Sequence, residues 1–146
     1  MNPGDRSPSV GVVIAAHGDL AHALRRSAEM IVGEQDSVAT VALNSQDSPD
    51  HLRAAIREAI GQVDRGAGVI VFVDLFGGTP GNAAALSIGS HRARIVSGVN
   101  LPMLLEVLLA RSTLALEALA ALALEIGVKS IAEISAEGQA QASTTD

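Results

Sequence analysis

Residues 10–16 read Val-Gly-Val-Val-Ile-Ala-Ala, an apolar run about as long as one β-strand. A continuous run of this kind is typical of a parallel strand whose sheet is covered by helices on both faces. Three further runs along the chain have the same character, at residues 37–43, 68–73 and 93–96. The sequence therefore predicts four parallel strands.

Each apolar run is followed by residues that start a helix. The first helix is expected to have Asp19 as its N-cap and to end at Gly33, with apolar residues at helical spacing between them. The second is expected to begin at Ser48 and Pro49 and to end at Gly66. Strands that alternate with such helices indicate crossover connections within one parallel sheet.

Residues 79–80 and 100–102 carry similar start signals and predict the third and fourth helices. A fifth helix is expected over residues 114–126, where the only charges are Glu117 and Glu125. A helix that is apolar on most faces must be covered on most faces. It is therefore either the most buried helix of a monomer or part of a homodimer interface.

Residues 128–135 alternate imperfectly between apolar and polar side chains and are interpreted as an edge strand. Together these elements predict a three-layer α/β/α fold with an open, mainly parallel sheet. The expected strand order is 2-1-3-4. We expect one domain over residues 10–135, between a flexible N-terminus at 1–9 and a flexible C-terminal tail at 136–146.

The composition of the 146-residue chain disfavours several functions. A net charge of −6 and only two aromatic residues make nucleic acid an unexpected partner. The lack of cysteine excludes disulfides and thiolate metal sites. The sequence also lacks a signal peptide and an apolar run as long as a membrane span, so we expect a cytoplasmic protein that does not insert into a membrane.

Ligands of open α/β sheets bind beyond the carboxyl ends of the strands, where the strand order reverses. His17 follows the first strand and Asp74 the third, so the expected order places them opposite each other. A carboxylate that holds one ring nitrogen as N–H leaves the other nitrogen free as a base or nucleophile. His17 could otherwise be a structural histidine or a metal ligand. We expect no metal, because three other histidines lack ligand-like spacing to it: His22, His51 and His91.

The loop after the third strand reads Gly-Gly-Thr-Pro at residues 77–80. Two glycines allow the backbone to approach a ligand, and the helix that follows directs free N–H groups toward an anion. Taken alone, the motif could be a tight loop with a capping threonine. Opposite a histidine nucleophile it predicts a phosphoryl site, and the negative charge of Asp74 would keep a phosphohistidine labile enough to pass its phosphoryl group on.

The chain resembles the mannose-family enzyme IIA domain of the bacterial phosphoenolpyruvate-dependent sugar phosphotransferase system. The resemblance extends over about residues 10–127. Four segments carry it in order: Val-Ile-Ala-Ala-His-Gly at 13–18, Ala-Glu-Met-Ile-Val-Gly-Glu at 28–34, Val-Asp-Leu-Phe-Gly-Gly-Thr-Pro-Gly-Asn-Ala-Ala at 73–84, and Ser-Gly-Val-Asn-Leu-Pro-Met-Leu-Leu-Glu at 97–106.

The resemblance implies that His17 accepts a phosphoryl group from phosphorylated HPr and passes it to a histidine of enzyme IIB, with no cofactor. It implies further that Asp74 orients the imidazole. The Thr79 hydroxyl and nearby loop amides, at Gly77 and Gly78, would receive the phosphoryl oxygens. Many relatives continue into a IIB domain, whereas this sequence ends in a short polar tail, so enzyme IIB is expected to be a separate protein.

The resemblance also implies a homodimer in which the C-terminal strand crosses to the partner subunit. Four residues are expected to line the rim of the site, where a methionine offers adaptable apolar contact: Asn100, Leu101, Pro102 and Met103. The role could be in transport or in regulation. Two alternatives stay open: a regulatory binding module that transfers no phosphoryl group, and the phosphoryl-donor subunit of a dihydroxyacetone kinase.

Overall fold

The computed structural model describes residues 7–75 and 79–136. The flexible termini expected from the sequence lie mostly outside these residues. Strands and helices alternate from the first strand to the fourth, and two further helices follow. The elements are β1 (Gly11–His17), α1 (Leu20–Val32), β2 (Val38–Leu43), α2 (Pro49–Val63), β3 (Val69–Val73), α3 (Thr79–Ser87), β4 (Ala93–Ser97), α4 (Leu101–Ala110) and α5 (Leu116–Lys129).

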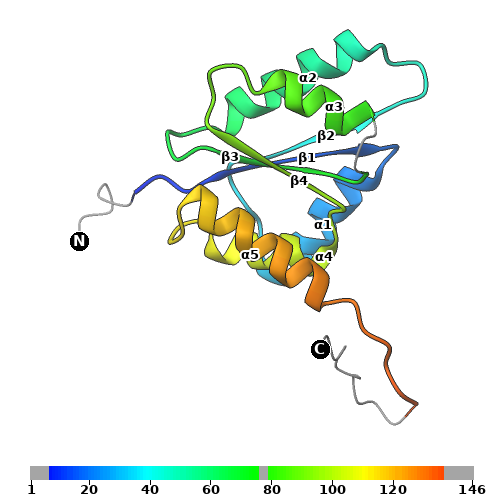
Figure 1. The fold of residues 1–146 in the computed structure, drawn as a ribbon, viewed down its shortest axis with the longest axis vertical. Coiled ribbons are helices and arrows are strands. Elements are labelled where there is room, and N and C mark those ends of the chain that lie inside the picture. Colours follow the sequence, from blue (N-terminus) through cyan, green and yellow to red (C-terminus); the bar gives the residue numbers. More distant parts are fainter. Residues whose placement is uncertain (1–6, 76–78, 137–146) are drawn as a thin grey trace.

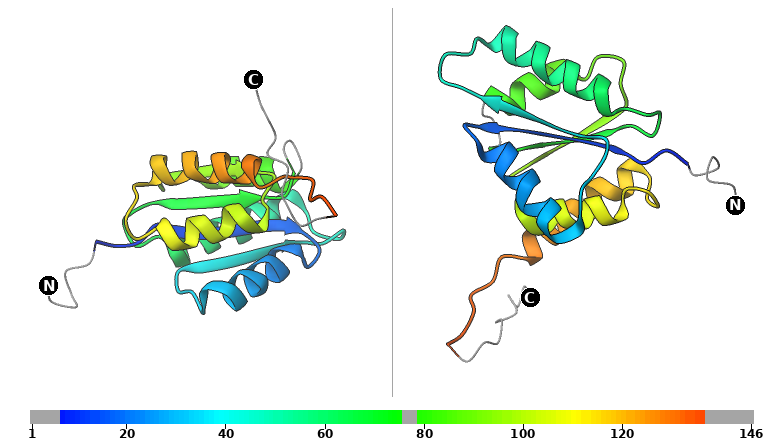
Figure 2. Two further views of the ribbon diagram at one scale, coloured as in Figure 1. Left: turned by 90° about the horizontal axis from the view of Figure 1, so that it is seen from below. Right: turned by 180° about the vertical axis from the view of Figure 1, so that it is seen from behind.

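The four strands form one parallel sheet in the order β2-β1-β3-β4, which confirms the predicted order. Helices α2 and α3 cover one face of the sheet, and α1, α4 and α5 cover the other (Figures 1 and 2). The predicted three-layer α/β/α architecture is therefore confirmed.

Two apolar cores lie on the two faces of the sheet. Because side chains alternate along a strand, Val12 and Ile14 pack toward α1, α4 and α5, whereas Val13 and Ala15 pack toward α2 and α3. All four side chains are fully buried, as are those of β3. This burial explains why β3, and β1 up to Ala16, are apolar without interruption.

All four expected helix starts agree with the structure, including that of α1 directly after Asp19, and two of them have a described side-chain cap. The Ser48 hydroxyl accepts a hydrogen bond from the His51 N–H at 3.1 Å, and the Asn100 side chain accepts one from the Met103 N–H at 3.1 Å. Asp19 makes no such bond. Its φ of −91° and ψ of 4° differ from the extended backbone that a capping side chain requires. Helix α2 also ends at Val63 rather than at Gly66.

The C-terminal region differs from the expected edge strand. Helix α5 continues to Lys129, so Val128 is helical, and no fifth strand joins the sheet within the residues that the structure describes. The helix is also not the most buried one of a monomer. It buries four residues of one stripe and leaves Leu124 55% and Val128 72% exposed. After it, residues 130–136 extend away from the body of the domain (Figure 1).

Gly11 allows a close approach between β1 and the end of α2. A Cβ atom at Gly11 would lie 2.4 Å from the backbone oxygen of Val63, so we expect Gly11→Ala to destabilise the fold by about 1–3 kcal/mol. Gly61 lies within α2, and a Cβ atom there would meet no neighbour within 4 Å. Gly61→Ala should therefore stabilise the fold by up to about 1 kcal/mol. Urea unfolding measures both changes, and equal midpoints for the two variants would contradict this packing.

Candidate functional site

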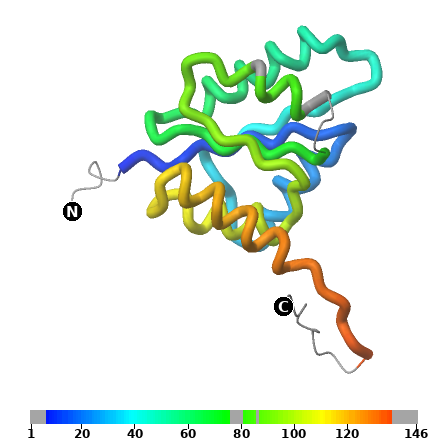
Figure 3. The backbone as a smooth tube through the Cα atoms, in the orientation of Figure 1, coloured from blue at the N-terminus to red at the C-terminus, as the bar shows by residue number. Residues whose placement is uncertain are grey.

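The candidate site lies at the carboxyl edge of the sheet, where β1 and β3 are neighbours. Ala15 pairs with Val73, so the residues that end or follow these strands emerge side by side. His17 is the last residue of β1, and Asp74 follows β3 directly. The backbone tube shows both chain segments reaching the same edge (Figure 3).

Asp74 binds His17 at two atoms. Its Oδ2 lies 2.8 Å from the imidazole Nδ1 and also accepts the backbone N–H of His17 at 3.1 Å. Because an ionised carboxylate only accepts hydrogen bonds, Nδ1 carries the proton, and Nε2 of the neutral ring keeps its lone pair. The His17 side chain is 49% exposed, whereas that of Asp74 is 12% exposed. The pair therefore presents an oriented, half-exposed imidazole, with the carboxylate of Asp74 more deeply buried behind it.

The electrostatics of Asp74 favour this arrangement. Burial favours the protonated acid, but the hydrogen bonds from the His17 ring and backbone outweigh burial and hold the pKa of Asp74 below its ordinary value of 3.8. Asp74 is therefore ionised at neutral pH. Its Oδ1 is buried without a hydrogen-bond partner in the described parts of the chain. Buried polar atoms without a hydrogen-bond partner are rare in proteins, and a role in a functional site is one explanation for such an atom.

Gly18 fixes the chain immediately after the histidine. It has a φ of +56°, in the left-handed region, and its N–H donates to the Leu43 carbonyl at 2.9 Å. His17 itself is in register with Leu43 of β2. The imidazole is thus carried by a backbone that is bound on both sides, by β2 and by Asp74.

A cavity of about 620 Å³ opens beside His17, on the side of β2. The polar loop between β2 and α2 supplies much of its lining. The cavity is lined by His17, Gly18, Leu43, Asn44, Ser45, Asp47 and Pro49. The sequence predicts no particular role for this loop, and its position after the end of a strand is the signal that points to it.

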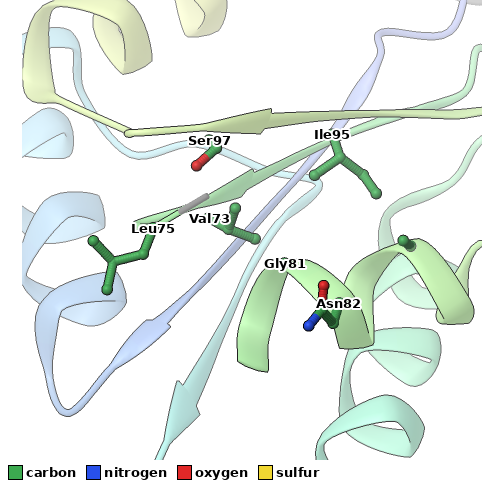
Figure 4. A pocket seen from close by; sticks show the side chains of 7 residues that line it. Val73, Leu75, Gly81, Asn82, Ile95 and Ser97 are labelled. Atoms are coloured by element: carbon green, nitrogen blue, oxygen red, sulfur yellow. The ribbon is translucent and has the colours of Figure 1, made fainter. Parts of the chain in front are cut away.

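A second cavity, of about 310 Å³, lies on the other side of Asp74. Val73 and Ile95 face α3 across it, and Asn82 of α3 and Ser97 of β4 add polar groups (Figure 4). Leu75, the residue after Asp74, is 56% exposed at this cavity. The histidine–aspartate pair is therefore flanked by a cavity with a mixed polar and apolar lining and by a largely apolar one.

The predicted phosphoryl loop is described only in part. Gly77 and Gly78 lie outside the described residues, as does the hydroxyl of Thr79. The backbone of Thr79 begins α3, so a helix N-terminus does start a few residues after Asp74. This position agrees with the helix start expected from Thr79-Pro80.

The four residues expected at the rim divide into two groups. Leu101 and Pro102 form the first turn of α4, and Pro102 is exposed. Asn100 donates to the Gly127 carbonyl at 3.0 Å and ties α4 to the end of α5. Met103 is only 4% exposed and contacts Gly127, so the expected apolar contact at the rim is wrong for this residue. A helix that begins at Leu101 turns Met103 inward, because the first turn of α4 packs on α5.

A second pair of the same chemistry lies at the opposite edge of the sheet. His91 Nδ1 is 2.7 Å from Asp64 Oδ2, between the end of α2 and the loop before β4. The hydrogen bond from His91, with another from the Gly66 N–H, lowers the pKa of Asp64 below its ordinary value of 3.8. Within residues 7–75 and 79–136, no three histidine or carboxylate side chains cluster as metal ligands would.

Comparison with known proteins assigns the chain to a family. A protein-family model described as "PTS system fructose IIA component" matches residues 11–124. The chain belongs to the EIIA-man family. This family consists of components of the bacterial sugar phosphotransferase system, so the resemblance seen in the sequence is confirmed.

Several EIIA-man relatives are similar over most of the chain. The fructose-specific EIIA component of Bacillus subtilis is 40% identical over 109 residues, which are 74% of this chain and 75% of the relative. The mannose-specific EIIAB component of Escherichia coli K12 is 32% identical over 131 residues. These residues are 88% of this chain but 41% of that longer relative.

Solved EIIA structures share the fold. The EIIA component from Streptococcus agalactiae superposes with a TM-score of 0.77 at 27% identity, over 85% of this chain and 96% of that one. A mannose/sorbose-specific IIA subunit from Enterococcus faecalis gives 0.77 at 29% identity, over 87% and 96%. Among the described residues of this EIIA chain, no helix is long and apolar enough to span a bilayer.

Proposed function

We propose that the chain is a phosphohistidine carrier, which accepts a phosphoryl group on His17 from phosphorylated HPr and passes it to enzyme IIB. The observation that carries the proposal is the bond between His17 Nδ1 and Asp74 Oδ2, because it leaves Nε2 as an exposed nucleophile. Membership of the EIIA-man family supports both partners. The proposal places the carrier in the cytoplasm together with HPr.

The transfer itself is a displacement at phosphorus. The lone pair of His17 Nε2 forms a bond to phosphorus while the phosphorus–nitrogen bond of the donor histidine breaks and leaves its electron pair on the donor nitrogen. Asp74 offsets the positive charge that the His17 ring gains and keeps the proton on Nδ1. The amides of Gly77 and Gly78 and the Thr79 hydroxyl receive the phosphoryl oxygens, which the start of α3 close to Asp74 supports.

Incubation of the protein with phosphoenolpyruvate, enzyme I and HPr tests this function. Intact mass, measured under alkaline conditions that preserve phosphohistidine, should increase by one phosphoryl group. A matched incubation without HPr should give no increase. No increase with HPr present would contradict the carrier function and would favour a binding module, or a chain that a different donor phosphorylates, as in a dihydroxyacetone kinase.

We also propose that the carrier is a homodimer in which the exposed face of α5 and the segment after it are covered by a second copy. Leu124, Val128, Ile131 and Ile134 are each more than half exposed, with fractions of 55%, 72%, 72% and 71%. Exposed large apolar side chains that gather in one region of a chain are typical of interfaces. If the two subunits exchange their C-terminal segments, residues 130–136 would cross from one subunit to the other.

We expect the wild-type chain to be a dimer at micromolar concentration and Leu124→Asp to be largely monomeric. A charge introduced into a covered apolar face costs several kcal/mol because it is desolvated without a partner. Met30 of α1 is 87% exposed and offers a matched control, so Met30→Asp should remain a dimer. Sedimentation equilibrium measures these states. A monomeric wild-type chain would contradict the proposed dimer.

A further inference from the structure

We propose that Asn44 and Ser45 donate hydrogen bonds to the phosphoryl group on His17, from the side of the histidine that faces β2. This inference rests on the proposed phosphoryl transfer at His17. The two donors come from the loop after β2, the strand that pairs with β1 on the side away from β3.

The fold places the two residues beside the histidine. Leu43 is in register with His17, and its carbonyl accepts the Gly18 N–H at 2.9 Å, so the chain leaves β2 at the level of the imidazole. Asn44 and Ser45 are the next two residues, and both line the cavity of about 620 Å³ that His17 also lines. The pairing of β1 with β2 therefore places Asn44 and Ser45 beside His17.

Hydrogen bonds between Asn44 and Asp47 fix the loop, and the side chains of Asn44 and Ser45 are without a partner among the described residues. The Asp47 N–H donates to the Asn44 carbonyl at 3.0 Å, and the Asn44 N–H donates to Asp47 Oδ2 at 3.0 Å. Asparagine and aspartate side chains commonly close turns in this way. The Asn44 amide and the Ser45 hydroxyl make no hydrogen bond to another described residue. The site thus offers three N–H or O–H donors on a backbone that is already ordered.

The charges around the cavity explain why neutral donors are needed. Its lining contains no lysine or arginine. Arg53, in the second turn of α2, is paired with Asp50. Asp47 and Asp74 are carboxylates that repel a phosphoryl group, so the group needs donors that compensate for this repulsion. Amide and hydroxyl donors do so without the strong attraction of a cation, which would hold the group too tightly for onward transfer.

The donors would act mostly in the transition state of the transfer. As the bond to the donor histidine breaks and the bond to Nε2 forms, negative charge spreads over three equatorial phosphoryl oxygens. Hydrogen-bond donors fixed in advance stabilise such charge without reorganisation. Loss of either donor should therefore lower kcat more than it raises KM for phosphorylated HPr.

The test uses Asn44→Ala, Ser45→Ala and the double variant, with Gln46→Ala as the matched control. Gln46 lies in the same loop, is exposed, and is not among the residues that line the cavity. We expect each single variant to lower kcat about 3- to 10-fold, the loss typical of one hydrogen bond, and Gln46→Ala to retain the wild-type rate. Ser45→Thr, which keeps the hydroxyl, should recover most of the Ser45 loss.

A second readout is the lifetime of the isolated phosphoprotein. Loss of the donors should change the rate at which phosphohistidine hydrolyses in Asn44→Ala and Ser45→Ala but not in Gln46→Ala, an effect that a purely structural role would not produce. If wild-type protein is phosphorylated and the Asn44 and Ser45 variants match Gln46→Ala in both kcat and lifetime, the inference is overturned. If wild-type protein is not phosphorylated at all, the proposed function fails, and this inference fails with it.

Discussion

Replacement of His17 by alanine is expected to abolish phosphoryl acceptance completely. The imidazole carries the nucleophilic nitrogen, and the methyl group of alanine offers no atom that can attack phosphorus. The fold should survive, because the side chain is 49% exposed and the backbone N–H of residue 17 still donates to Asp74. The change in the free energy of unfolding should stay within about 1 kcal/mol, the usual net contribution of one hydrogen bond.

Intact mass after incubation with phosphoenolpyruvate, enzyme I and HPr measures the loss, and thermal unfolding measures the stability. His51→Ala is a suitable control, because His51 is exposed on α2 and its side chain makes no described contact with the site. It should be phosphorylated like the wild type. Phosphorylation of His17→Ala at the wild-type level would place the acceptor elsewhere in the chain.

Replacement of Asp74 by alanine is expected to slow phosphorylation by about 10- to 100-fold without abolishing it, as is typical when the hydrogen-bond partner that orients a functional histidine is lost. Both bonds from His17 to Asp74 Oδ2 are then missing. The ring would be free to rotate and to move its proton from Nδ1 to Nε2, so only a fraction of the molecules would present the nucleophile. Rapid-quench kinetics with phosphorylated HPr measures the change.

The pair of His91 and Asp64 provides the matched control for Asp74. Its Nδ1–Oδ2 distance is 2.7 Å, against 2.8 Å at the site, but it lies at the opposite edge of the sheet. Asp64→Ala should therefore leave the phosphorylation rate unchanged. Equal rates for Asp74→Ala and Asp64→Ala would show that orientation of the imidazole by Asp74 does not matter.

Asp64→Ala should instead affect stability in a pH-dependent way. The pKa of Asp64 is lowered in the folded chain, so its contribution is present above the ordinary value of 3.8 and is lost as the pH falls through the lowered value. The difference in melting temperature between wild type and Asp64→Ala should accordingly shrink in strong acid.

Much of the fold can be read from the sequence because burial on both sheet faces leaves an unambiguous pattern. Residues 11–16 of β1 and all of β3 are apolar, and these are the strands that lie in the centre of the sheet. The strand order then brings His17 and Asp74 together at one edge, as the sequence analysis expected. Short sequence patterns are enough to predict these features, because each pattern involves only a few neighbouring residues and is interpreted by a general rule of parallel sheets.

The parts that could not be predicted depend on contacts between distant segments. Asp19 directly precedes α1, as the sequence predicts, but its backbone lies outside the extended region and its side chain makes no capping bond. From the sequence, Met103 is expected at the surface, but in the structure it packs against α5. Asn44 and Ser45 gain their importance from the register between His17 and Leu43, which a single sequence does not display.

The position of the phosphoryl group on the His17 ring tests the account most directly. Protein labelled with ¹⁵N and phosphorylated through HPr can be examined by NMR under alkaline conditions, where couplings between phosphorus and the ring nitrogens distinguish the two isomers. Because Asp74 holds the proton on Nδ1, we expect a single phosphohistidine with the bond at Nε2 of His17. A phosphoryl group on Nδ1 of His17, or on any other residue, would contradict it.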